Sequence, residues 1–455
     1  DHPKVLIFKK RADYDPQQVN ALLSGVDLTY VMNVTPRKAL SYPANLLLPA
    51  ERLAQQIAGG TWSELFNTTA LINRYPGIGL LYWYLMVTLL GWVVYPLVRL
   101  ALRGLPDKGY PLSKLVGMLL LAYLTWLAGS MRIPVTRGLI SVVAVLLLAL
   151  GGVLAYLQRR ELAEEWAQRR RYFLMVELVT VAFFAVDLLI RLGNPDLWHP
   201  YKGGEKPMDF SYFNAVIKST TFPPYDPWFA GGYINYYYFG FVISGMMVKW
   251  LGIVPAVAYN LILPTFFAFL AMGAFSFGWN LLVSWKARSG GEGYPGGRMG
   301  VPSRPLLAGL AAAVALLILG NLGTVRMIWH GMMRLAAPNG AFADGHILQK
   351  IIWTAQGFGR LLFGGMKLPY SPGDWYWIPS RAIPNEPITE FPFFTFLYGD
   401  PHAHLFALPL TLLALSWALS IVLGRWQWGD GAGRWRWTHY AASFLLGGLV
   451  IGLIA

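Results

Sequence analysis

The feature that most constrains this fold is a series of long apolar segments separated by short charged loops. Apolar residues form 55% of the 455 residues and charged residues only 13%, whereas soluble domains carry about 25% charged residues. Inside a bilayer no water satisfies backbone polar groups, so a chain spans as helices or as a closed barrel. The segments lack period-two alternation, which predicts an all-α integral protein of the cell membrane.

The lengths of these segments predict nine or ten transmembrane or re-entrant helices, because one crossing needs about 20 residues. The run 254–285 is too long for one ordinary crossing and contains Pro264. We therefore expect two short passes or a re-entrant hairpin there. The other expected spans are residues 77–102, 112–132, 138–158, 172–192, 232–251, 305–324, 403–424 and 437–455.

The basic residues indicate which loops face the cytoplasm. Lys and Arg exceed Asp and Glu by 14, and they gather in short loops, as the positive-inside rule predicts. This clustering favours membrane topology over nucleic-acid binding. Residues 1–75, 193–231 and 325–402 are then extracytoplasmic. If the run 254–285 crossed the membrane once, the basic segment 286–304 would face outside. We expect this segment to be cytoplasmic, which requires that the run does not make a single crossing.

Three regions are expected along the chain. The first contains a helix over residues 15–23 that Asp15 caps. The chain starts at Asp1 and ends within an apolar run, so we expect a piece of a longer protein, truncated at its C-terminus. The regions are a small N-terminal extramembrane segment, 1–75; a three-helix transmembrane module, 76–170; and a second transmembrane module, 171–455, with extracytoplasmic loops 193–231 and 325–402.

The loop after the fourth predicted span contains the first candidate site. Glu205 and Asp209 are four positions apart and would share one face of a short helix. Such carboxylates can act as a general base or hold a divalent cation. The alternative is that the loop is polar because it faces water. Asp226 lies between two prolines and is expected to shape a turn. The chain has no cysteine, which excludes thiol catalysis and Cys-ligated zinc.

A second candidate site precedes the span 403–424. Arg381 has the planar fork that binds phosphate. Asp400, His402 and His404 alternate along the chain, so an extended segment would point all three at one ion. On a helix they would diverge, and Asp400 would only start the helix. Both interpretations stay open.

Ionisable residues also lie within the fourth predicted span. Charges at this depth usually face a protein interior and can form a proton or ion path. Arg191 follows Asp187 by one helical turn, which predicts a simple ion pair. Glu177 lies nearer the cytoplasmic end, at headgroup depth. The run Tyr236–Tyr238 either anchors a helix at the interface or lines a sugar or lipid site.

Several strings resemble an uncharacterised group of large membrane proteins, named for its triple tyrosine and known from Chloroflexi and archaea. They occur in the same order and lie within roughly half of the chain. The matching strings are Arg191–Pro195, Glu205–Phe210, Phe222–Gly232, Tyr236–Gly240 and Ile388–His404.

The wider layout is similar to that of the GT-C glycosyltransferases, which use sugars linked to polyprenyl phosphate. This resemblance implies transfer of a sugar to an extracytoplasmic acceptor, with Asp209 as the base and Glu205 as its partner. It also implies that Arg381 holds the donor phosphate. In such enzymes the acidic loop follows the first span, whereas here it follows the fourth. The first three spans are therefore expected to belong to an upstream module. The further site residues are Tyr236, Tyr237, Tyr238 and Glu390 for substrate, and Asp400, His402 and His404 for a divalent cation.

The expected partners are the lipid bilayer, a lipid-linked sugar and either other membrane subunits or an upstream module of the same polypeptide. Nucleic acid is not expected. The alternative function is non-enzymatic: a transporter, or a structural subunit of a membrane complex. In that case Glu177, Asp187 and the run 254–285 would matter most.

Overall fold

The computed structural model describes most of the spanning part of the chain. The predicted extramembrane segment 1–75 is described only in part, and residues 289–302 lie outside the described ranges. The described residues are 14–26, 51, 54, 58–60, 62–197, 204–229, 232–288, 303–320, 322–371, 373–383, 387–424 and 436–454.

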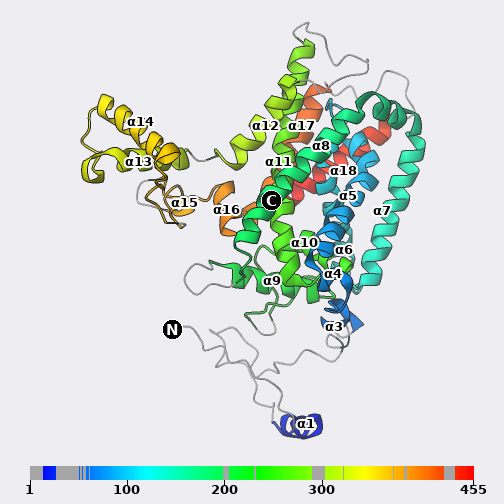
Figure 1. The fold of residues 1–455 in the computed structure, drawn as a ribbon. Helices are drawn as coiled ribbons and strands as arrows, with labels where there is room; N and C mark the ends of the chain where they lie inside the picture. Colours follow the sequence, from blue (N-terminus) through cyan, green and yellow to red (C-terminus); the bar gives the residue numbers. More distant parts are fainter. Residues whose placement is uncertain are drawn as a thin grey trace.

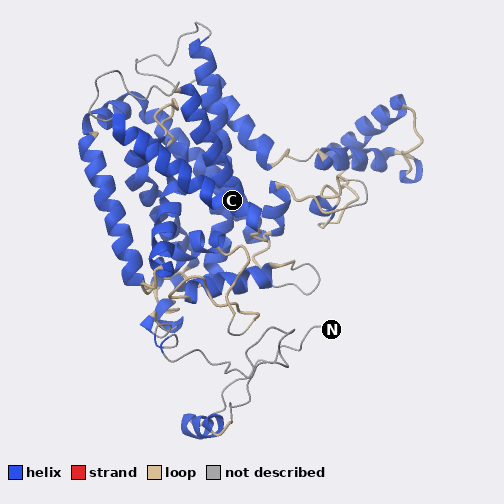
Figure 2. Cartoon of the chain, turned by 180° about the vertical axis from the view of Figure 1, so that it is seen from behind, coloured by secondary structure: helices blue, strands red, loops and turns tan. Residues whose placement is uncertain are grey.

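The regular structure of the described residues is helical (Figures 1 and 2), apart from one isolated bridge between Tyr225 and Tyr233. Within the described part of the chain, six helices are long and apolar enough to cross a membrane. The predicted all-α polytopic fold is therefore confirmed. The long helices are α5 (Pro76–Ala101), α6 (Ser113–Ser130, preceded by η1, Tyr110–Leu112), α7 (Arg137–Leu157), α8 (Arg159–Gly193), α11 (Pro255–Arg288) and α17 (Ala403–Leu423).

Shorter helices cover the ends and one side of this bundle, and α18 completes it near the C-terminus. The first of them, α1, begins where Asp15 accepts a hydrogen bond from the N–H of Gln17 at 2.8 Å, as the predicted cap requires. They are α1 (Pro16–Ser24), α3 (Trp62–Leu65), α4 (Leu71–Arg74), α9 (Lys206–Lys218), α10 (Phe239–Leu251), α12 (Ser303–Leu317), α13 (Gly323–Ala336), η2 (Pro338–Gly340), α14 (Ile347–Phe363), α15 (Asp374–Trp377), α16 (Pro392–Tyr398) and α18 (Arg436–Ile454).

Helix α11 is the central helix, and it corrects one prediction. It runs unbroken through Pro264, so 254–285 is neither two short passes nor a re-entrant hairpin. Proline removes one backbone hydrogen bond and strains the preceding turn. However, 89% of the most apolar part of α11 is buried, and packing against α8, α12 and α17 offsets that cost.

Helix α10 corrects the predicted span 232–251. Its 13 residues reach roughly 20 Å, less than the hydrocarbon thickness of about 30 Å. Both of its ends lie at one end of the bundle. The indole of Trp126, near the end of α6, donates to Tyr238 just before α10. Arg137, at the start of α7, donates to the carbonyl of Lys249 in its last turn. Helix α10 therefore returns to the side from which it came.

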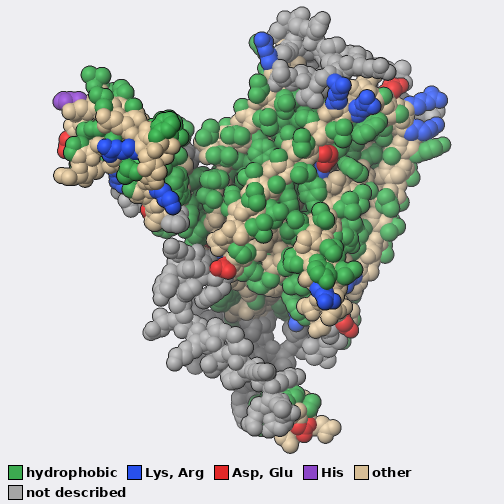
Figure 3. Space-filling view, in the orientation of Figure 1, with side chains coloured by type: hydrophobic (Ala, Val, Ile, Leu, Met, Phe, Trp, Pro, Cys, Tyr) green, Lys and Arg blue, Asp and Glu red, His purple; other side chains and the backbone are tan. Residues whose placement is uncertain are grey.

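Because α10 does not cross, the single crossing of α11 leads to the opposite end of the bundle. There Asn280 of α11 accepts a hydrogen bond from the N–H of Asp107, in the loop between α5 and α6. The segment 286–304 thus leaves α11 at the end that carries the other basic loops, hereafter the basic end. Lys and Arg side chains gather there, at the top of Figure 3.

The remaining predicted spans agree with helices to within two residues at each end, except for α8 and α12. Helix α12 ends at Leu317, well short of residue 324. Helix α8 starts at Arg159 and is continuous through position 170, where the sequence divides the chain into two modules. Its first half is rich in Glu, Ala and Arg, which are strong helix formers. The division into modules stays a prediction.

Candidate functional site

The candidate site lies at the end of the bundle opposite the basic end, where α9 meets the turn between α16 and α17. Glu205 occupies the N-cap position of α9, Pro207 lies in its first turn, and the N–H of Asp209 donates to the carbonyl of Glu205 at 2.9 Å. Proline suits this position because the first turn of a helix needs no N–H donor. The two acids therefore lie one turn apart at the start of a short helix, as the sequence predicts.

A glycine turn places the second group of residues. Gly399 ends α16 with φ of 73°, a left-handed conformation that favours glycine. A Cβ atom at this position would collide with the guanidinium of Arg191, so a side chain fits only if this buried arginine moves. The chain then extends through Asp400 to His402, which occupies the N-cap position of α17. The backbone N–H of Glu205 donates to Oδ2 of Asp400 at 2.9 Å, which ties the two segments together.

His402 is the centre of the cluster. Its Nε2 lies 3.1 Å from Oε2 of Glu205 and 3.5 Å from Oδ2 of Asp400. Its Nδ1 is hydrogen-bonded to Oε1 of Glu390 at 3.1 Å. The other oxygen of Glu390, Oε2, lies 3.3 Å from Nε2 of His404, and Thr395 is 2.6 Å from that nitrogen. One imidazole thus joins three carboxylates from separate parts of the chain.

Two groups of side chains could each hold a metal ion, and they share His402. One is Glu390, His402 and His404, and the other is Asp209, Asp400 and His402; the ligand atoms of each lie within 4.8 Å of one another. Asp400, His402 and His404 were expected at one ion, but the structure divides them between the two groups. His402 precedes the helix and His404 lies within it, so their side chains diverge.

The second group, hereafter the Asp209 group, fits a divalent cation better. Asp209 and Asp400 are 0% and 1% exposed. Oδ2 of Asp209 and Oδ1 of Asp400 have no hydrogen-bond partner, which is costly for buried polar atoms. Two carboxylates and one imidazole match the ligand preferences of ions such as Mn²⁺ and Zn²⁺. A bound cation would satisfy both oxygens.

The electrostatics of the cluster favour bound positive charge. Burial raises the pKa of Asp209 to about 9, and the neighbouring Asp400 reinforces the effect. The neighbouring carboxylates of Asp400 and Glu390 raise the pKa of the His402 imidazole to about 11. Burial would raise the pKa of Glu390, but its contacts with His402 lower it overall. Asp400 and Glu390 thus favour an imidazolium ion at His402, and a metal ion would supply the same positive charge.

The three tyrosines have different surroundings. The hydroxyl of Tyr237 donates to Oδ1 of Asp209 at 3.3 Å. The hydroxyl of Tyr238 accepts from the Trp126 indole at 3.1 Å, and its ring stacks on Phe222. Tyr236 is exposed beside Tyr237, with ring centroids 4.2 Å apart. Only Tyr237 therefore reaches the acidic cluster directly, while Tyr238 fixes the start of α10.

The hydrogen bonds and ion pairs given above for the acidic cluster do not include Arg381. Its guanidinium lies over the ring of Trp377, 4.2 Å from the centroid. Its role as a phosphate clamp stays a prediction. Asp226 forms the predicted turn, because its carboxylate accepts hydrogen bonds from the N–H groups of Trp228 and Phe229 at 2.8 and 3.2 Å.

Two buried basic residues beside the cluster were not predicted as site residues. Lys206 and Arg191 are almost fully buried. Their side chains lie beside Gly399, where a Cβ atom would be in any other residue. Burial lowers the pKa of Lys206. The sequence contained a hint of both residues, since Lys206 follows Glu205 and Arg191 begins the first of the matching strings. Neither residue, however, has a spacing that suggests a role by itself.

The predicted ion pair between Asp187 and Arg191 does not form. Asn260 of α11 instead accepts two hydrogen bonds from the Arg191 guanidinium, at 3.0 and 2.8 Å. Both carboxylate oxygens of Asp187 are buried without a hydrogen-bond partner. The predicted i, i+4 pair fails because the side chain of Arg191 turns toward α11. Glu177 is paired elsewhere, with Lys114 at 2.7 Å.

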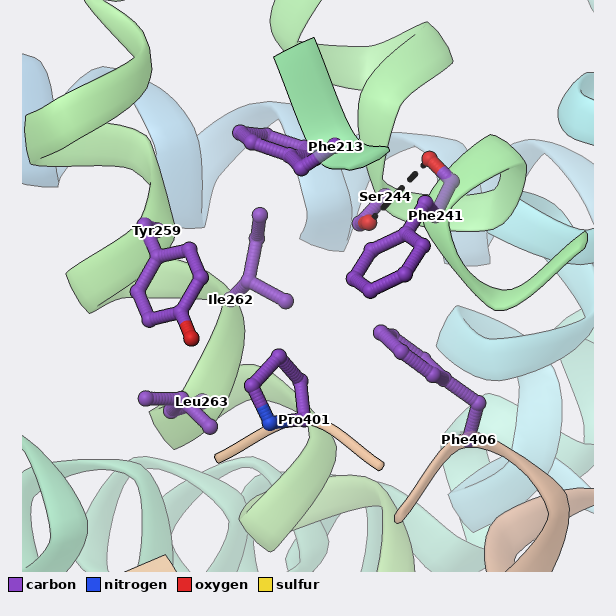
Figure 4. Close-up of a pocket in the computed structure, with 8 residues that line it drawn as sticks. All are labelled: Phe213, Phe241, Ser244, Tyr259, Ile262, Leu263, Pro401 and Phe406. Atoms are coloured by element: carbon purple, nitrogen blue, oxygen red, sulfur yellow. Dashed lines mark hydrogen bonds between the residues drawn. The ribbon is translucent and has the colours of Figure 1, made fainter. Parts of the chain in front are cut away.

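The floor below the site is apolar. Figure 4 shows Phe213, Phe241, Tyr259 and Phe406 around a small cavity that Pro401 closes on one side. Its volume is about 10 Å³, which is room for about one water molecule. The hydroxyl of Ser244 is turned to the carbonyl of Phe241. The acidic cluster thus rests on an aromatic layer, and its Glu205 side chain is exposed at the surface.

Comparison with known proteins gives one match. Residues 120–455, well over half of the chain, match the family described as Uncharacterized membrane protein (DUF2298). No curated protein matches the chain. No solved structure matches it. The match supports the resemblance to an uncharacterised membrane family, and with the six spanning helices it identifies a multi-pass membrane protein. The chain therefore belongs to the DUF2298 membrane protein family.

Proposed function

We propose that the protein is a membrane glycosyltransferase that moves a sugar from a polyprenyl-phosphate donor to an extracytoplasmic acceptor. The observation that carries this proposal is the convergence of Asp209 with Asp400 and His402. Buried carboxylates with perturbed pKa values are typical of catalytic sites. A membrane boundary is also where a lipid-linked donor presents its reactive phosphate.

Asp209 acts as the general base in this proposal. Its raised pKa of about 9 makes the ionised form a strong base, and this form takes the proton of an acceptor hydroxyl as that oxygen attacks the anomeric carbon of the sugar. A new glycosidic bond forms, the bond from the anomeric carbon to the phosphate oxygen breaks, and polyprenyl phosphate leaves with the bonding electrons. Tyr237 orients Asp209 through its hydrogen bond. Glu205 contacts His402 at the exposed side of the cluster.

A divalent cation would be held by Asp400, His402 and Asp209, with Glu390 orienting the imidazole through Nδ1. When bound, it would neutralise the charge that develops on the leaving phosphate. Arg381 would hold the same phosphate nearer the surface. The lipid chain of the donor remains in the bilayer beside α8, where Leu189 and Leu192 are exposed next to the site.

The test is incorporation of a labelled sugar from a synthetic polyprenyl-phosphate donor by the chain in proteoliposomes. Asp209→Asn should lower the rate by a factor of about 10² or more, because a general base contributes 10²–10⁴. Arg381→Ala should raise the KM for the donor. Asp226→Asn is the matched control, since Asp226 caps a turn in the same loop. Equal rates for the Asp209 variant and its control would exclude Asp209 as the base.

A further inference from the structure

A helical hairpin stands off the side of the bundle, at the height of its spanning helices (Figures 1 and 2). It consists of α13 and α14, with the short turn η2 between them. The two helices pack against each other, and the indole of Trp329 donates to the hydroxyl of Thr354 at 2.8 Å. Gly357 allows a close approach, because a Cβ atom there would collide with the carbonyl of Met332. The proposed transfer reaction does not use this hairpin.

Helix α14 packs against α13 through one narrow face. Successive residues of a helix are turned by about 100°, so the residues of this face fall within a sector of roughly 100°. Gly357 is buried there, and Lys350, Trp353, Thr354 and Leu361 are partly buried. The rest of the circumference of α14 is left without contact to α13.

The opposite face of α14 is apolar and uncovered. It includes six large side chains, each more than half exposed: Leu348, Ile351, Ile352, Phe358, Leu362 and Phe363. Around the helix they form a continuous band about 140° wide, hereafter the apolar stripe. Soluble proteins rarely leave such a patch open to water, so the stripe needs a cover.

Basic side chains border the apolar stripe. Around α14, Lys350 lies beyond one edge of the stripe and Arg360 beyond the other. Residues 322–371 contain one acid, Asp344, and five bases: Arg326, Arg334, Lys350, Arg360 and Lys367. Among the described residues, no ion pair involves any of these five bases. The hairpin therefore carries net positive charge that an anionic surface would complement.

The hairpin also continues the lipid-facing surface of the bundle. Helix α12 follows the basic end and packs along α11. Its 15 residues rise roughly 22 Å, less than the hydrocarbon thickness of about 30 Å. Leu307 on α12 is exposed, and so are Leu319 and Leu322 in the link to α13. The chain thus enters the hairpin along an apolar surface and within reach of the bilayer.

We propose that the hairpin α13–α14 is an interfacial membrane anchor. The apolar stripe enters the acyl chains of the outer leaflet, on the side predicted for residues 325–402, and the bases contact anionic lipid headgroups. Helices with a large apolar face and Lys or Arg beside it bind membranes in this way. The anchor is independent of the proposed transfer reaction, because it uses no residue to which that reaction assigns a role.

Single cysteine labels test the anchor directly, since the chain has no cysteine of its own. Phe358→Cys carries the label in the apolar stripe. Gln356→Cys is the matched control, because Gln356 is also exposed but lies about 160° away around the same helix. Each full-length variant is labelled with a nitrobenzoxadiazole fluorophore and reconstituted in phosphatidylglycerol nanodiscs.

Two quenchers then locate each label. A nitroxide on the lipid acyl chains should quench the label at position 358 several-fold more than iodide in the buffer, and the label at position 356 should show the reverse. Quenching of the 358 label by iodide would overturn the proposal, since the stripe would face water. Protection from both quenchers would also overturn it, because a second copy of the chain would then cover the stripe.

A polar replacement within the stripe provides a second test. Leu362→Asn should expose the 358 label to iodide several-fold more, because the side chain no longer favours the acyl chains. Leu362 is more than half exposed, so its replacement should not disturb the packing against α13. Gln356→Asn is the control, because it places the same side chain outside the stripe. Equal iodide quenching in the two variants would exclude insertion of the stripe.

The lipid charge tests the role of the bases. Acyl-chain quenching of the 358 label should be stronger in phosphatidylglycerol than in phosphatidylcholine, and high salt should reduce the difference. Lys350→Gln combined with Lys367→Gln should reduce it as well. Equal quenching in the two lipids would show that the bases do not bind anionic headgroups.

Discussion

The backbone N–H of Glu205 donates a 2.9 Å hydrogen bond to the carboxylate of Asp400, 195 positions later in the chain. This contact joins the start of α9 to the approach to α17. It also fixes Oδ2 of Asp400 on the backbone, so Oδ1 stays without a hydrogen-bond partner next to Asp209. One hydrogen bond thus links two loops and orients a carboxylate of the candidate site.

Replacement of Asp400 tests this link. Asp400→Ala should lower the free energy of unfolding by about 1–3 kcal/mol, because the partly buried N–H of Glu205 loses its charged acceptor. Asp400→Asn keeps a carbonyl oxygen at the same place and should cost less. The measurement is thermal unfolding in detergent, with hydrogen exchange at the start of α9. If the two variants lose the same stability, the link to Glu205 contributes nothing measurable.

Gly399→Ala should destabilise the protein through two separable effects. The positive φ costs a side chain roughly 1–2 kcal/mol, and the new Cβ would lie 2.2 Å from Nη1 of Arg191. Gly365→Ala is the control, because Gly365 has φ of 62° and nothing within 4 Å of its Cβ position. The Gly399 variant should therefore lose more stability in a thermal unfolding assay. A smaller loss than in the control would contradict the crowded turn.

Added cation should stabilise the protein through the Asp209 group. At a free Mn²⁺ concentration of 100 Kd the unfolding free energy should rise by about 2.7 kcal/mol, and a chelator should reverse the effect. Asp209→Asn should remove most of this gain, whereas His404→Gln should leave it. The reverse ranking would move the ion to Glu390, His402 and His404. Differential scanning fluorimetry of the purified chain measures all three proteins.

The three tyrosines should give three different results when each loses its hydroxyl. Tyr237→Phe should slow sugar transfer most, because its hydroxyl contacts Asp209. Tyr238→Phe should lower the unfolding free energy by about 1 kcal/mol, since the Trp126 indole loses its acceptor. Tyr236→Phe should change little. Initial rates and thermal midpoints distinguish the three, and equal losses of rate would mean that the run acts only as an anchor.

Local patterns predicted much of the fold. Apolar length and flanking charge located α5, α7 and α17 to within a residue or two. The same reasoning was wrong for α10 and α11. A window of sequence cannot show that α10 returns to its own side, because its contacts with Arg137 and Trp126 come from other helices. It also cannot show that tight packing compensates for Pro264.

The candidate site was predictable as a list of residue types but not as an arrangement. The spacing of Glu205 and Asp209 correctly placed both at the start of one helix. The spacing of Asp400, His402 and His404 suggested one ion, yet the helix begins between the two histidines. The pairing of Glu177 with Lys114, and the turn of Arg191 toward Asn260, depend on neighbouring helices.

The sequence by itself determined that this is a helical multi-pass membrane protein and which loops carry basic charge. Those properties follow from the partition of each segment between water and lipid and from hydrogen bonds within a helix, which act over a few residues. Only the tertiary structure decided that Asp209 meets Asp400, that α10 does not cross and that α14 turns its apolar stripe away from α13. Such contacts join distant segments, and they depend on how whole helices pack.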